Sequence, residues 1–93
     1  LASPLSVPEL ARMTRLSTSH FSALFRSATG MAVTEYLKRL RSARARELLI
    51  TTSMPISDLA KRVGYDDAFY FSRQFRSVNG VSPREFRRRA LES

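Results

Sequence analysis

The segment ISDLAKRVGYDDAFYFSRQFR, residues 56–76, predicts two short helices joined by a tight turn. Gly64 lies where the first helix should end, because helices commonly stop in a left-handed residue that glycine adopts at little cost. Asp66 or Asp67 can then cap the second helix by accepting hydrogen bonds from its free N–H groups. The first helix has one apolar face, formed at helical spacing by Leu59, Ala60 and Val63.

The second helix of this segment separates an inward stripe from its other faces. The inward stripe consists of Phe71, Phe75 and Val78. The side chains left on other faces, several of them outward, are Phe69, Tyr70, Arg73 and Ser77. A helix-turn-helix unit offers arginine and aromatic side chains to a DNA major groove in this way. Ordinary packing of a helical hairpin gives the same pattern, so this segment alone leaves both interpretations open.

The pattern occurs a second time, because residues 7–41 align with residues 56–89. The matched pairs are Leu10-Ala11 with Leu59-Ala60, Phe21 with Phe71, Phe25 with Phe75, Arg26 with Arg76, Ser27 with Ser77, Gly30 with Gly80, Glu35 with Glu85 and Tyr36 with Phe86. The offset in numbering grows by one after the first pair, so the second turn carries one extra residue. An insertion at a turn between helices in register is expected of a duplicated structural unit.

Capping patterns place the remaining short helices. Ser6 and Glu9 have capping-box spacing around Pro8, and predict a helix to about Thr14. A second helix begins at Ser17 or Thr18 and ends at Gly30, with a core stripe of Phe21, Leu24, Phe25 and Ala28. Near the C-terminus, Ser82, Pro83 and Glu85 repeat the capping box. They predict a last helix with Phe86 inward and with four arginines outward: Arg84, Arg87, Arg88 and Arg89.

The longest predicted helix covers residues 33–50. Its expected buried positions are Tyr36, Leu37, Leu40, Ala43, Leu48 and Leu49. Its arginines Arg41, Arg44 and Arg46 are interpreted as a solvated face. Pro55 excludes a continuing helix after it. At about 1.5 Å per residue the rod spans roughly 27 Å, so it could hold two recognition helices near one DNA turn, about 34 Å, apart.

The segment GYDDAFYFSRQFRSVNGVSPREFR, residues 64–87, is similar to the signature of the AraC/XylS family. The resemblance covers nearly the whole chain. It implies an all-α fold with two helix-turn-helix units on a long linker helix, and sequence-specific binding of double-stranded DNA in bacterial transcription regulation. The expected recognition helices are residues 18–29 and 67–79, in adjacent major grooves. The chain is expected to divide into a first helix-turn-helix unit (1–32), a linker helix (33–51), and a second helix-turn-helix unit with a C-terminal helix (55–93). Family members usually have one more helix before the first unit, which residues 1–5 are too short to supply, and a chain beginning at Leu1 suggests an excised domain.

The resemblance also assigns base-facing positions. In the first unit they are Ser19, Ser22 and Ala23, and in the second they are Ala68, Phe69, Tyr70, Ser72 and Arg73. Arg73 is favoured because one guanidinium can donate two hydrogen bonds to guanine. Tyr70 and Phe69 can touch a thymine methyl, although Phe69 can instead pack locally. The expected phosphate contacts are Arg26, Lys38, Arg62, Arg76, Arg87 and Arg88, each of which can also be only a surface charge.

The charge balance favours a polyanionic partner. The 93 residues carry 16 Lys and Arg against 8 Asp and Glu, a formal net charge of +8. Such a charge suits nucleic acid or an acidic membrane surface. Most of the basic residues are arginines, which suit bidentate contacts, although a GC-rich genome gives the same bias. The absence of cysteine excludes a disulfide framework and a structural zinc finger.

No group of residues indicates catalysis, a metal or a cofactor. His20 lies near Ser19 and Ser22 without an acid to orient it, and Asp66 with Asp67 resembles a helix cap more than a metal site. Expected partners are double-stranded DNA and, in the full-length protein, RNA polymerase and an effector-binding domain. The fragment is expected to be monomeric and cytoplasmic, associated with the nucleoid and not with a membrane. The alternative is a non-specific basic or architectural nucleic-acid-binding module.

Overall fold

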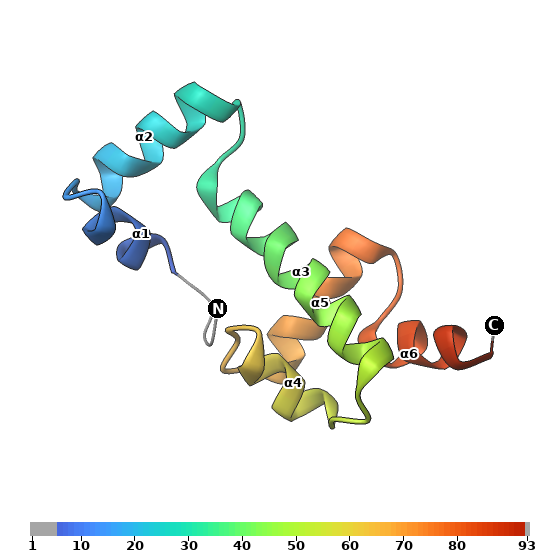
Figure 1. Ribbon diagram of the computed structural model, residues 1–93. Helices are drawn as coiled ribbons and strands as arrows, with labels where there is room; N and C mark the ends of the chain where they lie inside the picture. The colour runs from blue at the N-terminus through green and yellow to red at the C-terminus, as the bar shows by residue number, and fades with distance from the viewer. Residues whose placement is uncertain (1–5, 93) are drawn as a thin grey trace. The chain divides into compact units, whose positions relative to one another are not determined.

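The computed structural model describes residues 6–92, which form six helices and no strand (Figure 1). The helices are α1 (Val7–Met13), α2 (Thr18–Thr29), α3 (Val33–Thr51), α4 (Ile56–Arg62), α5 (Ala68–Asn79) and α6 (Pro83–Glu92). The all-α prediction is therefore confirmed. The chain divides into two compact units inside α3, between Arg39 and Leu40. The first unit holds α1, α2 and the start of α3, and the second unit holds the rest.

Short side-chain caps begin the two helices of the first unit. The Ser6 hydroxyl oxygen accepts a hydrogen bond from the Glu9 N–H at 3.3 Å, as predicted. The Glu9 carboxylate accepts a hydrogen bond from the Ser6 hydroxyl at 3.0 Å. Glu9 therefore reaches back to the side chain of Ser6, not to its backbone N–H. Ser17, one of the two candidates, caps α2 by accepting from the His20 N–H at 3.1 Å. Gly30 ends α2 in the left-handed conformation with φ of 77°.

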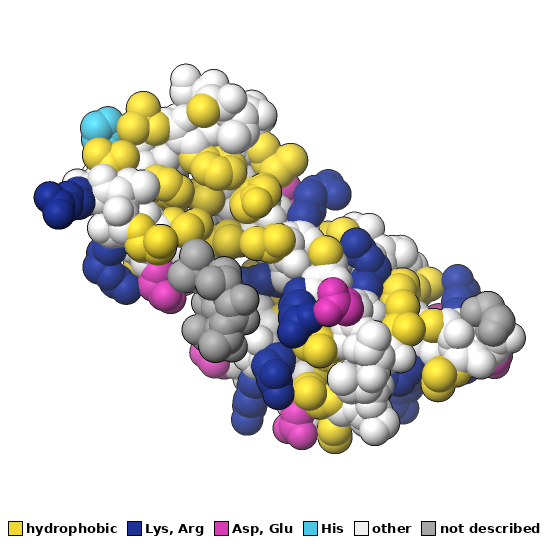
Figure 2. Space-filling model, viewed as in Figure 1, with side chains coloured by type: hydrophobic (Ala, Val, Ile, Leu, Met, Phe, Trp, Pro, Cys, Tyr) yellow, Lys and Arg dark blue, Asp and Glu magenta, His cyan; other side chains and the backbone are white. Residues whose placement is uncertain are grey.

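The core of the first unit is thin. Its buried apolar residues are Ala11, Val33 and Leu37. Phe21 and Phe25 are only half-buried, and their ring centroids lie 6.0 Å apart. The prediction that Leu24 and Ala28 belong to the core is wrong, because both are exposed and Leu24 keeps 49% of its surface. α1 has seven residues against twelve in α2, so it cannot cover the full length of α2. Figure 2 shows hydrophobic side chains on the visible surface of this unit.

The second unit has a continuous core. The predicted apolar faces of α4 and α5 are confirmed for Leu59, Ala60, Val63, Phe71 and Phe75, which are all at most 1% exposed, while Val78 is only half-buried. The rest of the cluster comes from the end of α3 and from the α4–α5 turn, and consists of Ala45, Leu48, Leu49 and Tyr65. Phe86 of α6 packs against the cluster from outside, with its ring edge-on to Phe75 at 5.6 Å.

Three of the predicted buried positions in α3 are wrong. Leu37, Leu48 and Leu49 are buried as expected, but the exposed residues of the set are Tyr36, Leu40 and Ala43. Ser42 and Ala45 are buried in their place. The middle of α3 therefore turns a small face inward, on which Ala45 packs in the apolar cluster and Ser42 makes hydrogen bonds.

The two units share the same turn between their short helices. The Leu16 N–H donates to the Ala11 carbonyl at 3.1 Å, and the Tyr65 N–H donates to the Ala60 carbonyl at 2.8 Å. Just before each donor, the backbone is left-handed at Arg15, with φ of 61°, and at Gly64, with φ of 108°. Asp67, one of the two candidates, caps α5 by accepting from the Phe69 N–H at 2.9 Å. Asp66 precedes the cap, in the turn where one extra residue was expected.

Candidate nucleic-acid interface

One line of side chains runs along the outer surface of α5. Phe69, Arg73 and Arg76 follow at spacings of four and three residues, which place them on one helix face. All three are exposed, and Phe69 keeps 81% of its surface. Phe71 and Phe75 lie roughly opposite and are buried. α5 therefore packs against the core by one face. Its opposite face exposes an aromatic ring followed by two guanidinium groups to solvent.

The exposure of Phe69 removes the local-packing interpretation of that side chain. Tyr70 lies beside the outer line, 46% exposed, and the Cζ atom of Arg73 is 5.8 Å from the centroid of the Tyr70 ring. This distance is typical of a cation–π contact. Two other predicted base-facing residues are less available, since Ser72 is half-buried and Ala68 packs against the core.

α2 presents the equivalent line with smaller side chains. Ser19, Ala23 and Arg26 have the same spacing as the outer line of α5, and all three are exposed. Ser22, the remaining predicted position in this unit, is half-buried. Both α2 and α5 thus carry an arginine in the last turn, but only α5 carries large side chains on this line in the first two turns.

The predicted phosphate contacts fall into two groups by their surroundings. Arg26, Arg62 and Arg76 are exposed, and their side chains make no hydrogen bond or ion pair with the residues described, 6–92. Lys38 is half-buried, with its Nζ 3.8 Å from a carboxylate oxygen of Glu35. Arg88 forms ion pairs on its own helix, where it contacts Glu85 and lies 2.7 Å from Glu92. Hydrogen bonds from Arg88 and then Arg89 lower the pKa of the Glu85 carboxyl, so the charge of Arg88 is already partly neutralised.

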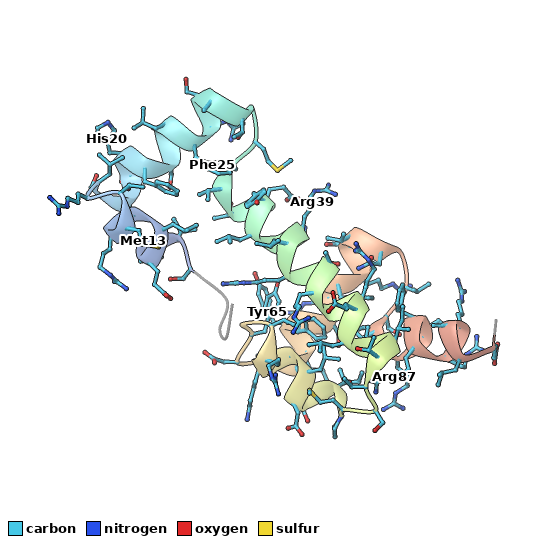
Figure 3. All side chains as sticks on the ribbon, in the orientation of Figure 1. Met13, His20, Phe25, Arg39, Tyr65 and Arg87 are labelled. Atoms are coloured by element: carbon cyan, nitrogen blue, oxygen red, sulfur yellow. The ribbon has the colours of Figure 1, made fainter. Side chains whose placement is uncertain are left out.

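Arg87 does not point outward, and that part of the prediction is wrong. Its Nε donates to the carbonyl of Leu49 at 3.0 Å, and its two Nη atoms donate to the carbonyls of Met54 at 2.8 Å and Thr52 at 3.3 Å. Figure 3 shows this side chain beside the end of α3. The carbonyls at a helix end lack hydrogen-bond donors within the helix. Arg87, which lies on α6, provides these donors. It therefore fixes the connection between α3 and α4.

A polar clamp that sequence reasoning missed joins α3 to the end of α5. Arg46 donates to the Asn79 Oδ1 at 2.9 Å and to the Ser42 hydroxyl at 3.3 Å. The Asn79 Nδ2 in turn donates to the Ser42 hydroxyl at 2.6 Å. The solvated-face interpretation holds for Arg44, which pairs with Glu47 at 2.5 Å, and is wrong for Arg46. With the Asp67 cap at its start and this clamp at its end, α5 is held at both termini.

Arg41 is the other arginine of α3 that turns inward. It is half-buried, and its Cζ lies 5.4 Å from the ring centroid of Tyr65. Burial raises the pKa of the Tyr65 hydroxyl, while the charge of Arg41 opposes this shift. The solvated-face interpretation is therefore wrong for Arg41 as well.

These features define a class of protein, the helix-turn-helix DNA-binding domain. Each unit pairs a short helix with a capped second helix, and α5 presents basic and aromatic side chains on the face that a major groove would meet. Among residues 6–92 there is no cluster of three side chains suited to a metal ion. Within the same described part of the chain, no helix has the length and apolarity needed to cross a membrane.

Comparison with known proteins identifies the family. A model described as a helix-turn-helix domain matches residues 10–89. The arabinose operon regulatory protein of Salmonella typhimurium is 41% identical over 85 residues, covering 91% of this chain and 30% of that protein. The C-terminal domain of AraT, a response regulator from Geobacillus stearothermophilus, superposes with a TM-score of 0.82 at 36% identity over 90% of this chain and 69% of that chain. The DNA-binding domain of AdpA, a global transcriptional factor solved with a target DNA, gives a TM-score of 0.81 at 31% identity over 94% of this chain and 78% of that chain.

The chain belongs to the AraC-type family of helix-turn-helix domains, as the resemblance implied. Membership makes the chain a DNA-binding domain of a kind found in transcription regulators. The chain spans only 30% and 29% of the length of two curated relatives.

Proposed function

We propose that this chain is the DNA-reading part of a longer bacterial transcription regulator and carries no catalytic activity. The observation that supports this most directly is the outer line Phe69–Arg73–Arg76 on α5. α2 and α5 each enter a major-groove segment of one asymmetric site, and a single copy of the chain binds it, because the duplication already supplies two readers.

Base recognition is concentrated in the second unit. Arg73 donates two hydrogen bonds to a guanine, and Phe69 contacts a thymine methyl, since these are the groups that each side chain suits in a major groove. The small side chains of α2 discriminate bases weakly. The remaining base contacts in this proposal are Ser19, Ser22, Ala23, Tyr70 and Ser72.

Phosphate contacts come first from Arg26, Arg62 and Arg76, which no acidic side chain neutralises among the described residues. Lys38 and Arg88 contribute less because each already faces a carboxylate. Arg87 leaves the set, because its guanidinium donors are engaged by backbone carbonyls.

The rest of the full-length protein supplies control. The greater length of the curated relatives supports an additional effector-binding domain outside this chain, and a regulator of this kind acts through RNA polymerase. The protein then works in the bacterial cytoplasm on nucleoid DNA.

Selection of bound duplexes from a random pool, followed by competition with single-base variants, tests the proposal. Arg73→Ala should cost about 1–3 kcal/mol of binding free energy on the selected site and relax preference at one or two base pairs. Arg73→Lys keeps the charge but loses the two parallel donors of the guanidinium. Compared with Arg73→Ala, it should therefore restore overall affinity better than discrimination between bases.

Arg76→Ala is the matched control, one turn further along the same face. It should weaken all sequences alike and reduce the log–log salt slope by about 1, as expected for one phosphate contact. Equal loss on all variants with Arg73→Ala would remove its base-reading role. A pool that yields no preferred sequence would favour the non-specific alternative.

A further inference from the structure

Four side chains of the second unit form one column, with two neighbouring aromatic rings in the middle and an arginine at each end. The Arg41 Cζ lies 5.4 Å from the Tyr65 centroid, and the Tyr65 ring meets Tyr70 edge-on at 5.8 Å. Tyr70 then has the Cζ of Arg73 5.8 Å from its own centroid. Figure 3 shows Tyr65 next to α3. The column therefore runs from α3, through the turn after α4, to the outer face of α5.

The two rings of the column differ in exposure. Tyr65 is 8% exposed, belongs to the core cluster and lies 5.4 Å from the buried Phe71 ring. Tyr70 is 46% exposed, and Arg73 is exposed. A free arginine on a surface samples many rotamers and loses that freedom when it binds. A stack on Tyr70, whose ring in turn meets the core residue Tyr65, restricts those rotamers before binding.

We infer that Tyr70, held edge-on by Tyr65, is a positioning residue that orients the Arg73 guanidinium for base recognition. This inference rests on the proposed function and adds to it, since Tyr70 acts here through Arg73 in addition to any contact of its own. It predicts that the aromatic ring at position 70, and not its hydroxyl, sets how sharply Arg73 discriminates.

The first test needs no DNA. In the folded protein, the Arg73 Nε–Hε NMR signal should carry a ring-current shift that Tyr70→Leu abolishes and Tyr70→Phe retains. An Arg73 signal that Tyr70→Leu leaves in place would overturn the inference. Thermal unfolding of both variants, measured in parallel, shows whether they fold.

The second test measures discrimination, the ratio of affinities for the selected site and its single-base variants. Tyr70→Leu should reduce this ratio about two- to fivefold, the size expected for loss of an exposed cation–π contact, and Tyr70→Phe should retain it. Leu91→Ala, which changes a 74%-exposed residue at the end of α6, is the control and should have no effect.

A double-variant cycle separates this inference from the proposed function. At the base pairs whose preference Arg73→Ala relaxes, adding Tyr70→Leu to Arg73→Ala should change discrimination no further, since the side chain being positioned is gone. If Arg73→Ala lowers discrimination and Tyr70→Leu does not, the positioning role is wrong while base reading stands. If Arg73→Ala itself leaves discrimination unchanged, the base-reading role and the inference fall together.

Discussion

Arg15 holds a left-handed backbone at the position that Gly64 fills in the second unit. This conformation costs a side-chain-bearing residue about 1–2 kcal/mol, whereas glycine carries an entropic penalty of about 0.5–1 kcal/mol. Arg15→Gly should therefore raise the free energy of unfolding by up to about 1 kcal/mol. Urea denaturation checks this. Arg15→Ala, which keeps the strain and removes the charge, is the control, and an equal gain in both variants would point to the charge instead.

Tyr65 should make stability depend on alkaline pH. Burial raises the pKa of its hydroxyl in the folded protein above the ordinary value of 10.0, so the folded state holds this proton more tightly than the unfolded state. The contribution is fully present below about pH 10 and is lost as pH rises toward the folded pKa. Tyr65→Phe should flatten this part of the pH profile in denaturation experiments, with Tyr36→Phe as the control. Parallel profiles for wild type and Tyr65→Phe would contradict the expectation.

At the scale of elements, the end of α3 depends on α6 through Arg87. Three hydrogen bonds from one charged group to buried or half-buried carbonyls predict that Arg87→Ala lowers the free energy of unfolding by about 2–4 kcal/mol. Arg87→Lys should recover only part of the lost free energy of unfolding, because an ammonium group cannot reproduce the planar arrangement of guanidinium donors. Arg84→Ala, on an exposed position of the same helix, should change stability little. Equal effects of Arg84→Ala and Arg87→Ala in urea would show that Arg87 is not a cap.

The helices themselves were predictable because their signals are local. Caps such as Ser17 and Asp67, the glycine that ends α2 and the apolar repeats of α4 and α5 act within one or two turns of the chain. Spacing also placed Arg73 on the face opposite Phe71 and Phe75.

The inward arginines were not predictable because their partners lie far along the chain. Arg46 meets Asn79 at a separation of 33 residues, and Arg87 meets Leu49 at 38. In the sequence, Arg87 cannot be told apart from its neighbours Arg88 and Arg89. Arg46 likewise has the pattern of an ordinary charge on a helix surface. Periodicity could have raised the question for Arg87, since it directly follows the inward Phe86 on a short helix.

At the scale of the whole molecule, the two units have unequal cores. The second unit buries nine residues in one cluster, whereas α2 of the first unit has no buried residue. Hydrogen exchange should therefore show the amides of α1 and α2 opening more readily than those of α4 and α5. Native-state exchange followed by NMR or mass spectrometry measures this. Equal protection in both units would mean that the half-buried Phe21 and Phe25 suffice to hold the first unit.

The opposition of two stripes on α5 has an evolutionary consequence. Residues that hold the helix to its core point one way, and the residues that we propose to read bases point the other, so a substitution at position 69 or 73 leaves the core packing untouched. Exposed substitutions usually change stability by less than about 0.5 kcal/mol. α2 already shows the outcome, because the same scaffold carries serine and alanine where α5 carries phenylalanine and arginine. Descendants of this chain can thus drift to new target sequences through mutations that selection for folding does not oppose.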